Sequence, residues 1–204
     1  YRLPLFALLL MFCAGARADV LLLVHGYQGN IYSWERSGVV PVLQHFGWKR
    51  AAVLLATPGG LVPVAMPWPN AENKVVNLQL NTVLPLEVQA SMLTSALRWI
   101  NDRYPSEKVI IAGHSLGGLV ARFSLVRDGA HNIKALITIA SPHLGTAIAY
   151  RGLDEIDDPF PLDMMKEFFA GSYYDTLQRS RGLLHQIVPA VPGKLLFWLN
   201  SRGH

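Results

Sequence analysis

The sequence has little cysteine and little charge, and each shortage excludes a class of protein. Cys13 is the single cysteine among 204 residues, which excludes a disulfide framework and a zinc site built from cysteines. Only 16% of the residues are charged, and the net charge of +4 is not gathered into a basic cluster, so we expect no nucleic-acid partner. Internal repeats and low-complexity tracts are also absent, which leaves a globular protein of ordinary size.

Apolar residues are what the sequence has in quantity. They make up 51% of the chain, and the mean hydropathy is +0.26. These values exclude a disordered chain and a coiled coil. At 22.6 kDa the chain is long enough to bury a core that folds without disulfide bonds.

The first 18 residues have the pattern of a secretory signal peptide. Arg2 supplies the positive charge, an apolar run covers residues 3–16, and Ala16-Arg17-Ala18 is a small-x-small cleavage site. The run is shorter than the roughly 20 residues that a membrane-spanning helix needs. We therefore expect a secreted or periplasmic protein, anchored to a membrane if the segment stays uncleaved. A buried core element is the alternative interpretation of these residues.

Apolar runs alternate with helical patterns after this segment. Continuous apolar runs, typical of parallel strands buried on both faces, predict strands at 20–24, 51–56, 108–112 and 135–140. Helices are expected at 31–46, 85–104 and 116–127. Residues 57–84, rich in proline, glycine and asparagine, predict a long surface connection. The alternation favours an α/β fold with a mostly parallel, doubly wound sheet.

The most specific motif is Gly113-His114-Ser115-Leu116-Gly117, which matches G-x-S-x-G. It lies directly between an expected strand and an expected helix, the context that this motif requires. The glycines permit a sharp turn that holds a serine out at the end of the sheet, and Gly118 permits close packing of the helix that follows. The motif predicts Ser115 as a nucleophile.

A serine nucleophile needs N–H donors for the oxyanion that forms on its substrate. The backbone N–H of Leu116, the residue after the serine, is one expected donor. The loop His25-Gly26-Tyr27 follows the first strand, and we expect the N–H of Tyr27 to be the other. His25 and His114 are expected to make local structural hydrogen bonds, with His114 turned away from the serine hydroxyl.

These two motifs, followed by Ala140-Ser141-Pro142-His143-Leu144-Gly145-Thr146, resemble the α/β-hydrolase lipases. In bacterial triacylglycerol lipases and in PGAP-type GPI inositol-deacylases, a similar segment follows the next strand. The resemblance covers residues 20–146 and, more loosely, 190–204. It implies the α/β-hydrolase fold, no cofactor, a lipid or small ester as substrate, and transient contact with a lipid surface.

The chain departs from this family in its second half. In α/β hydrolases the acid and then the histidine follow the serine along the chain, yet we expect no strand after residue 140. We therefore expect the chain to stop before its last strands and before the acid and base. His185 and His204 are the candidate bases that follow Ser115. The acidic residues after the third motif are candidate acids, a solvated hinge or a calcium site: Asp154, Glu155, Asp157, Asp158 and Asp163. No spacing of histidine and aspartate names a metal.

The sequence thus divides into a signal peptide (1–18), an α/β-hydrolase core (19–145) and a helical lid or cap (146–204). In the last region, Met164, Met165, Phe168 and Phe169 either cover an apolar pocket or form the core of a helical insertion. We expect a serine carboxylic-ester hydrolase, a lipase or esterase that forms an acyl-enzyme at Ser115. The alternatives are a lipid acyltransferase, a lipid-anchor deacylase, or a non-catalytic binding module that lacks the histidine and acid.

Overall fold

A computed structural model describes residues 19–157 and 173–202 of the chain. The expected signal peptide, the Met and Phe residues at 164–169, and His204 lie outside the described residues. One six-stranded sheet has the order β3-β2-β4-β1-β5-β6. Its strands are β1 (Asp19–Val24), β2 (Trp48–Thr57), β3 (Gly60–Ala65), β4 (Asn73–Gln79), β5 (Lys108–His114) and β6 (Ile133–Ile139). Each strand pairs in parallel with its neighbours except β3, which pairs antiparallel with β2.

The predicted surface connection at 57–84 is wrong, because two strands lie within it. β3 forms one edge of the sheet, where Pro63 is tolerated because an edge strand can lack one N–H donor. β4 lies in the interior of the sheet between β1 and β2. Its apolar run is short and interrupted by Lys74 and Asn77, two polar residues that are buried in this structure.

The helices of the first 145 residues are close to those expected. α4 (Leu86–Arg103) and α5 (Leu116–Asp128) confirm the predicted helices. The helix expected at 31–46 is instead two short ones, α2 (Ser33–Arg36) and α3 (Val39–His45). Gly38 separates them with a φ of +83°, a backbone conformation that glycine adopts at little cost. Pro41 lies in the first turn of α3, where its missing N–H is not needed.

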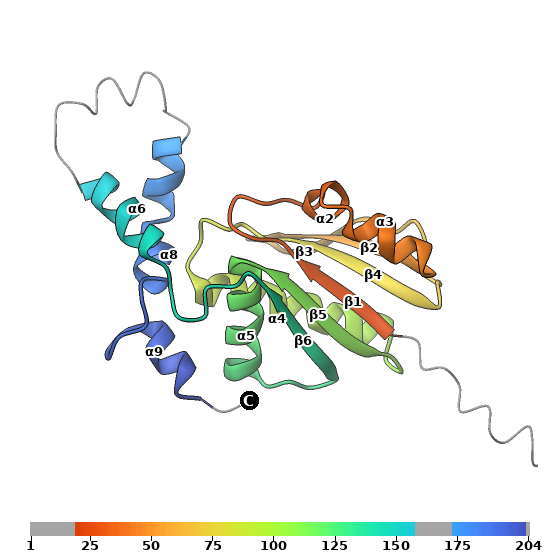
Figure 1. Cartoon of the computed structure of the whole chain (residues 1–204). Coiled ribbons are helices and arrows are strands. Elements are labelled where there is room, and N and C mark those ends of the chain that lie inside the picture. Colours follow the sequence, from red (N-terminus) through yellow and green to blue (C-terminus); the bar gives the residue numbers. More distant parts are fainter. Residues whose placement is uncertain (1–18, 158–172, 203–204) are drawn as a thin grey trace, which may run out of the picture.

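The helices cover both faces of the sheet (Figure 1). Alternate residues of β1 point to opposite faces, as they must in a strand. Val20, Leu22 and Val24 pack with α4 and α5 in the larger core. Leu21 and Leu23 pack with Trp34 and Val40, from α2 and α3, in a smaller core. Because helices cover both faces of the sheet, successive residues of a strand are buried on either side, and the strand sequence is a continuous apolar run.

After β6 the described chain is helical: α6 (Ala147–Asp157), residues 173–179, α8 (Arg181–Gln186) and α9 (Leu195–Asn200). Figure 1 shows α6, α8 and α9 beyond the carboxyl ends of the strands. Leu183 and Leu196 are fully buried in the same core as α4 and α5. Among the described residues, no strand follows β6, and no helix combines the length and the apolar character needed to cross a membrane.

Candidate active site

Ser115 occupies a strained turn between β5 and α5. Its φ of +51° and ψ of −122° lie in a region that residues with a side chain rarely adopt, and such strain often marks a functional position. The Ser115 N–H donates to the Ile139 carbonyl at 2.8 Å, which fastens the turn to the end of β6. The serine is thereby held at the carboxyl edge of the sheet.

The glycines of the G-x-S-x-G motif lie so close to neighbouring backbone that a side chain at these positions would collide with it. A Cβ on Gly113 would lie 2.6 Å from the Gly118 Cα, and a Cβ on Gly117 would lie 2.5 Å from the His25 carbonyl oxygen. A Cβ on Gly118 would collide with the Ser141 hydroxyl, which lies in the third sequence motif. The three motifs therefore pack against one another around the serine.

The loop after β1 lies directly against the serine. A Cβ on Gly26 would be 3.0 Å from the Ser115 Cβ. The loop turns back through a hydrogen bond from Gly29 N–H to the Gly26 carbonyl (3.0 Å), and Gln28 N–H donates to the Thr82 hydroxyl (3.0 Å). None of the hydrogen bonds between described residues uses the N–H of Tyr27 or of Leu116. Both predicted oxyanion donors are therefore left for a ligand.

His25 is buried, and both of its ring nitrogens form hydrogen bonds with backbone groups. The Leu80 N–H donates to its Nε2 at 3.2 Å, so Nε2 must be unprotonated. Nδ1 then carries the proton and donates to the Gly26 carbonyl at 2.9 Å. Burial lowers the pKa of this imidazole from its usual 6.5, because desolvation disfavours the charged form. His25 therefore positions the loop as a neutral group.

The other histidines lie in different surroundings. His114 is exposed, and its ring meets the edge of Trp34 with 6.4 Å between centroids. His185 lies exposed on α8 and lines neither of the cavities that Ser115 lines. His143 bonds through Nε2 to the Thr138 hydroxyl at 3.0 Å. Of the two predicted bases, the structure thus does not bring His185 to the serine, and His204 is outside the described residues.

Ser115 lines two cavities. The helix-side cavity, about 720 Å³, lies against α6, α8 and the helical residues 173–179 and is lined by Leu116, Ile148, Leu177, Leu184 and Ile187 among others. The α2-side cavity, about 370 Å³, is lined by Ser33, Trp34, Ser37, His114 and Ile139 among others. A third cavity, about 740 Å³, lies between α5 and β6 and does not include Ser115. Ser115 thus lies in the wall of both the helix-side and the α2-side cavity.

The side chain of Tyr27 is tied to the helical residues 173–179 through Ser180. Its hydroxyl lies 2.7 Å from the Ser180 Oγ. Ser180 is fully buried and donates its one proton to the Thr176 carbonyl at 2.7 Å. Tyr27 must therefore be the donor in the first bond. No sequence motif marks Ser180, because its partner is 153 residues away.

The acidic residues after β6 are dispersed. Glu155 lines the helix-side cavity, whereas Asp157 forms an ion pair with Arg181 at 2.5 Å. Asp158 and Asp163 lie outside the described residues. Within residues 19–157 and 173–202, no three histidine, cysteine, aspartate or glutamate side chains gather as they would around a metal ion.

The sheet order, the serine turn and the loop that packs on it define the class: the chain has the α/β-hydrolase fold. Residues 72–155 match the family model described as "PGAP1-like alpha/beta domain". GPI inositol-deacylase of Candida albicans is 34% identical over 89 residues, which is 42% of this chain and 20% of that protein. The enzyme of the same name from Debaryomyces hansenii is 35% identical over 71 residues, 31% of this chain and 7% of that protein. The chain thus spans a fifth or less of these relatives.

Solved structures agree on the fold. Bacillus licheniformis lipase BlEst2, in its mature form, has a TM-score of 0.53 at 18% identity, covering 92% of this chain and 58% of that one. Phospholipase PlaB from Legionella pneumophila has a TM-score of 0.55 at 14% identity, covering 90% of this chain and 35% of that one. At these identities the likeness concerns the fold, and it confirms the α/β-hydrolase architecture predicted from the sequence.

Proposed function

We propose that the protein is a serine carboxylic-ester hydrolase, a lipase or esterase with Ser115 as its nucleophile. The observation that carries this proposal is the strained turn at Ser115, with two unoccupied backbone N–H groups beside it and a cavity on either side. A strained conformation of this kind costs about 1–3 kcal/mol, and a half-buried serine at the end of a parallel sheet does not need it for packing.

The residues support acyl transfer in two steps. The Ser115 Oγ bonds to the ester carbonyl carbon while its proton passes to an imidazole base, and the carbonyl oxygen becomes an oxyanion held by the Tyr27 and Leu116 N–H groups. The carbon–oxygen bond to the alcohol then breaks, and the alcohol leaves with the proton from the base. Water attacks the acyl-serine in the same way and releases the carboxylic acid.

We propose that the imidazole base and its acid partner come from outside the described residues. His25 uses both ring nitrogens on the loop, and His185 lines neither cavity at the serine. Without a base, a serine hydroxyl is a weak nucleophile at neutral pH.

The helix-side cavity supports a lipid substrate, because aliphatic side chains such as Ile148, Leu177 and Ile187 line part of it and it is large enough for an acyl chain. Within this class, a lipid-anchor deacylase is the second candidate, favoured by the similarity of residues 72–155 to the PGAP1-like family. We also propose that the chain is exported and meets its substrate at a lipid surface, where the exposed Ile148 lies beside the site.

A fluorophosphonate probe tests the proposed function directly. The reading frame is sequenced on both sides of these codons first, so that the protein is tested as its organism makes it. We expect covalent labelling at Ser115, lost in Ser115→Ala and retained in Ser91→Ala, a control serine on the exposed side of α4. Hydrolysis of a short ester should follow the same pattern.

Folded protein that stays unlabelled, or label that persists in Ser115→Ala, would overturn the proposal. The first outcome would leave the non-catalytic binding module. Product analysis with an added alcohol acceptor separates hydrolase from acyltransferase, because a transferase forms a new ester where a hydrolase forms the free acid.

A further inference from the structure

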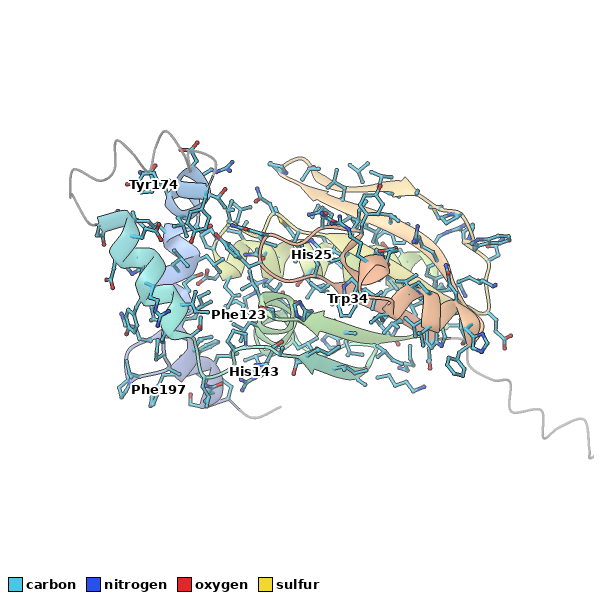
Figure 2. The ribbon with its side chains drawn as sticks, turned by 45° about the horizontal axis from the view of Figure 1, so that its top comes forward. His25, Trp34, Phe123, His143, Tyr174 and Phe197 are labelled. Atoms are coloured by element: carbon cyan, nitrogen blue, oxygen red, sulfur yellow. The ribbon has the colours of Figure 1, made fainter. Side chains whose placement is uncertain are left out.

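One face of α6 lines the helix-side cavity. The residues that α6 contributes are Ile148, Ala149, Arg151, Gly152 and Glu155, and steps of three and four residues place them on one side of the helix. Figures 1 and 2 show α6 beside the helical residues 173–179, on which Figure 2 labels Tyr174. Its neighbour Tyr173 lines the same cavity, as does Ser115. α6 therefore forms one wall of a space that the nucleophile shares.

Two charges of opposite sign lie on this face of α6. Arg151 and Glu155 are four residues apart, so their Cβ atoms are about 5–6 Å from each other. Within residues 19–157 and 173–202, neither side chain forms an ion pair or a hydrogen bond. On the same helix, Asp157 does not line the cavity and is paired with Arg181. The charges that α6 presents to the cavity are thus the ones left for a ligand.

We propose that Arg151 and Glu155 bind a zwitterionic headgroup, and that the substrate is a glycerophospholipid with an ammonium group, such as a phosphatidylcholine or a phosphatidylethanolamine. Arg151 binds the phosphate and Glu155 binds the ammonium. As a statement about the substrate, this inference rests on the proposed function, since Ser115 attacks an ester of the lipid that the headgroup site holds.

The phosphate has suitable donors on this wall. A guanidinium can donate two parallel N–H bonds to the oxygens of a phosphate. The Thr146 Oγ, also in the lining, accepts from Ile148 N–H at 3.2 Å, so its own proton remains to be donated. In a glycerophospholipid the phosphate and the esters are attached to the same glycerol unit. A phosphate held at Arg151 therefore keeps an ester in the cavity that Ser115 lines.

The ammonium has suitable partners one turn further along the helix. Glu155 supplies the negative charge, and the ring of Tyr173 is 48% exposed and can bind a cation over its face. Partial burial raises the pKa of the Tyr173 hydroxyl, and the charge of Glu155 raises it further, so the carboxylate and the phenol lie near each other. Two carbon atoms join the phosphate to the nitrogen in these headgroups, a span close to one turn of a helix.

The rest of the lining favours a lipid over a small zwitterion such as an amino acid. Leu177, Leu184 and Ile187 line the same cavity, and an amino acid would leave this apolar surface uncovered. At about 720 Å³, the cavity has roughly 24 times the volume that a water molecule occupies in the liquid. That volume admits a headgroup together with part of an acyl chain.

Three esters with the same two hexanoyl chains test the assignment, each kept below the concentration at which it forms micelles. Dihexanoylphosphatidylcholine carries both charges, dihexanoylphosphatidylmethanol carries only the phosphate, and dihexanoylglycerol carries neither. Arg151→Met and Glu155→Gln remove one charge each. Arg98→Met, at an exposed position of α4, and Asp154→Asn, at an exposed position of α6, are the matched controls, because neither residue lines a cavity at Ser115.

We expect the parent to have its highest kcat/KM for the phosphatidylcholine. Arg151→Met should lower kcat/KM about tenfold for the two phosphate esters and leave dihexanoylglycerol unchanged, because a charged hydrogen bond to the phosphate is lost. Glu155→Gln should lower kcat/KM for the phosphatidylcholine alone, because only that ester carries a cation. The two controls should change no ratio. Titration calorimetry with the ether-linked analogue of the phosphatidylcholine, which has no ester to hydrolyse, should show the same tenfold loss of affinity in Arg151→Met.

The two ways of failing are distinguishable. If the parent binds the ether analogue through Arg151 but hydrolyses no ester and is not labelled by the fluorophosphonate, the proposed function fails and the headgroup site stands. If it hydrolyses all three esters and Arg151→Met affects them alike or not at all, the proposed function stands and the headgroup site is overturned. Absence of both binding and hydrolysis overturns both. Circular dichroism of each variant shows that it is folded.

Discussion

At the scale of single residues, the burial of His25 makes the stability of the protein depend on pH. Its pKa is lowered by burial from 6.5, so the unfolded chain takes up a proton as the pH falls below that value while the folded protein does not. The contribution of His25 to the free energy of unfolding is therefore full above pH 6.5 and is lost as the pH falls toward the lowered pKa of the folded state.

We expect His25→Gln to be less stable than the parent at pH 8, because it alters the bonds to Leu80 and Gly26. Its free energy of unfolding should nevertheless fall less between pH 8 and pH 5, because glutamine does not titrate. Urea unfolding across this range measures both effects. His131→Gln, at an exposed turn, is the control and should keep the parent's pH dependence. An equal fall in His25→Gln would contradict the assignment.

Tyr27 and Ser180 supply a second test at the residue scale. Tyr27→Phe and Ser180→Ala each remove the hydrogen bond between them, which frees the loop that carries one proposed oxyanion donor. Because small misplacements at a reacting centre are costly, we expect each to lower kcat about tenfold with little change in KM. The double variant should be no slower than either single one. Tyr32→Phe, an exposed tyrosine nearby, should have no effect, and additive losses would show that the two residues act independently.

At the scale of secondary-structure elements, a buried ion pair holds the start of β4. The Lys74 Nζ lies 2.6 Å from a Glu107 carboxylate oxygen and 5.0 Å from the centre of the Tyr104 ring. The pair joins β4 to the connection between α4 and β5, and the lysine side chain is 5% exposed. Burial of this kind makes the partners depend on each other.

Lys74→Met should therefore cost about 3–5 kcal/mol in the free energy of unfolding, because it leaves the Glu107 carboxylate without its cation. Arg181→Met is the control at the exposed pair with Asp157, where the two side chains are 52% and 51% exposed, and it should cost less than about 1 kcal/mol. Urea unfolding of both variants gives the comparison. Equal losses would mean that the pair at β4 contributes no more than a surface pair.

Much of the fold could be predicted at this scale, and the exceptions have one cause. β1, β5 and α5 were predictable because their apolar residues follow one another or recur at helical spacing. The interior position of β4 was not, because its Asn77 looks like a loop residue until its partners are known. The Asn77 amide donates to the Ile31 carbonyl (3.0 Å) and to Glu35 (2.9 Å), residues more than 40 positions earlier.

The candidate site likewise has residues that could be predicted from the sequence and residues that could not. Ser115 and the glycines around it were predictable because a strand, a sharp turn and a helix follow one another within about 20 residues. Ser180 was not, because nothing in its local sequence distinguishes it. Its importance comes from Tyr27, a neighbour that only folding brings beside it.

At the scale of the whole molecule, the helices after β6 belong to the main core. Leu183 on α8 is fully buried and packs in the same cluster as Leu22 and Leu119. α8 is also tied to α4 by hydrogen bonds from Leu86 N–H to Gln186 (2.7 Å) and from Gln186 to Glu87 (2.6 Å). We propose that the described helices after β6, within residues 147–157 and 173–200, unfold together with the core of residues 19–145.

Leu183→Ala should then lower the stability of the whole protein by about 2–5 kcal/mol. In hydrogen exchange at increasing urea, amides of β1 and of α8 should lose protection at the same concentration, in the parent and in the variant. Loss of protection in α8 alone would show that the cap opens as a separate unit.

The hydrogen bond from Tyr27 to Ser180 also bears on how substrate enters. Ser180 lies at the end of the helical residues 173–179, which line the helix-side cavity, and Tyr27 belongs to the loop beside Ser115. If that wall of the cavity swings outward to widen the entrance, the bond breaks and the loop that carries the Tyr27 N–H loses one of the hydrogen bonds that hold it. On the proposed function, a molecule whose wall has moved outward to admit a bulky ester would hold this oxyanion donor less firmly than one whose wall is in place.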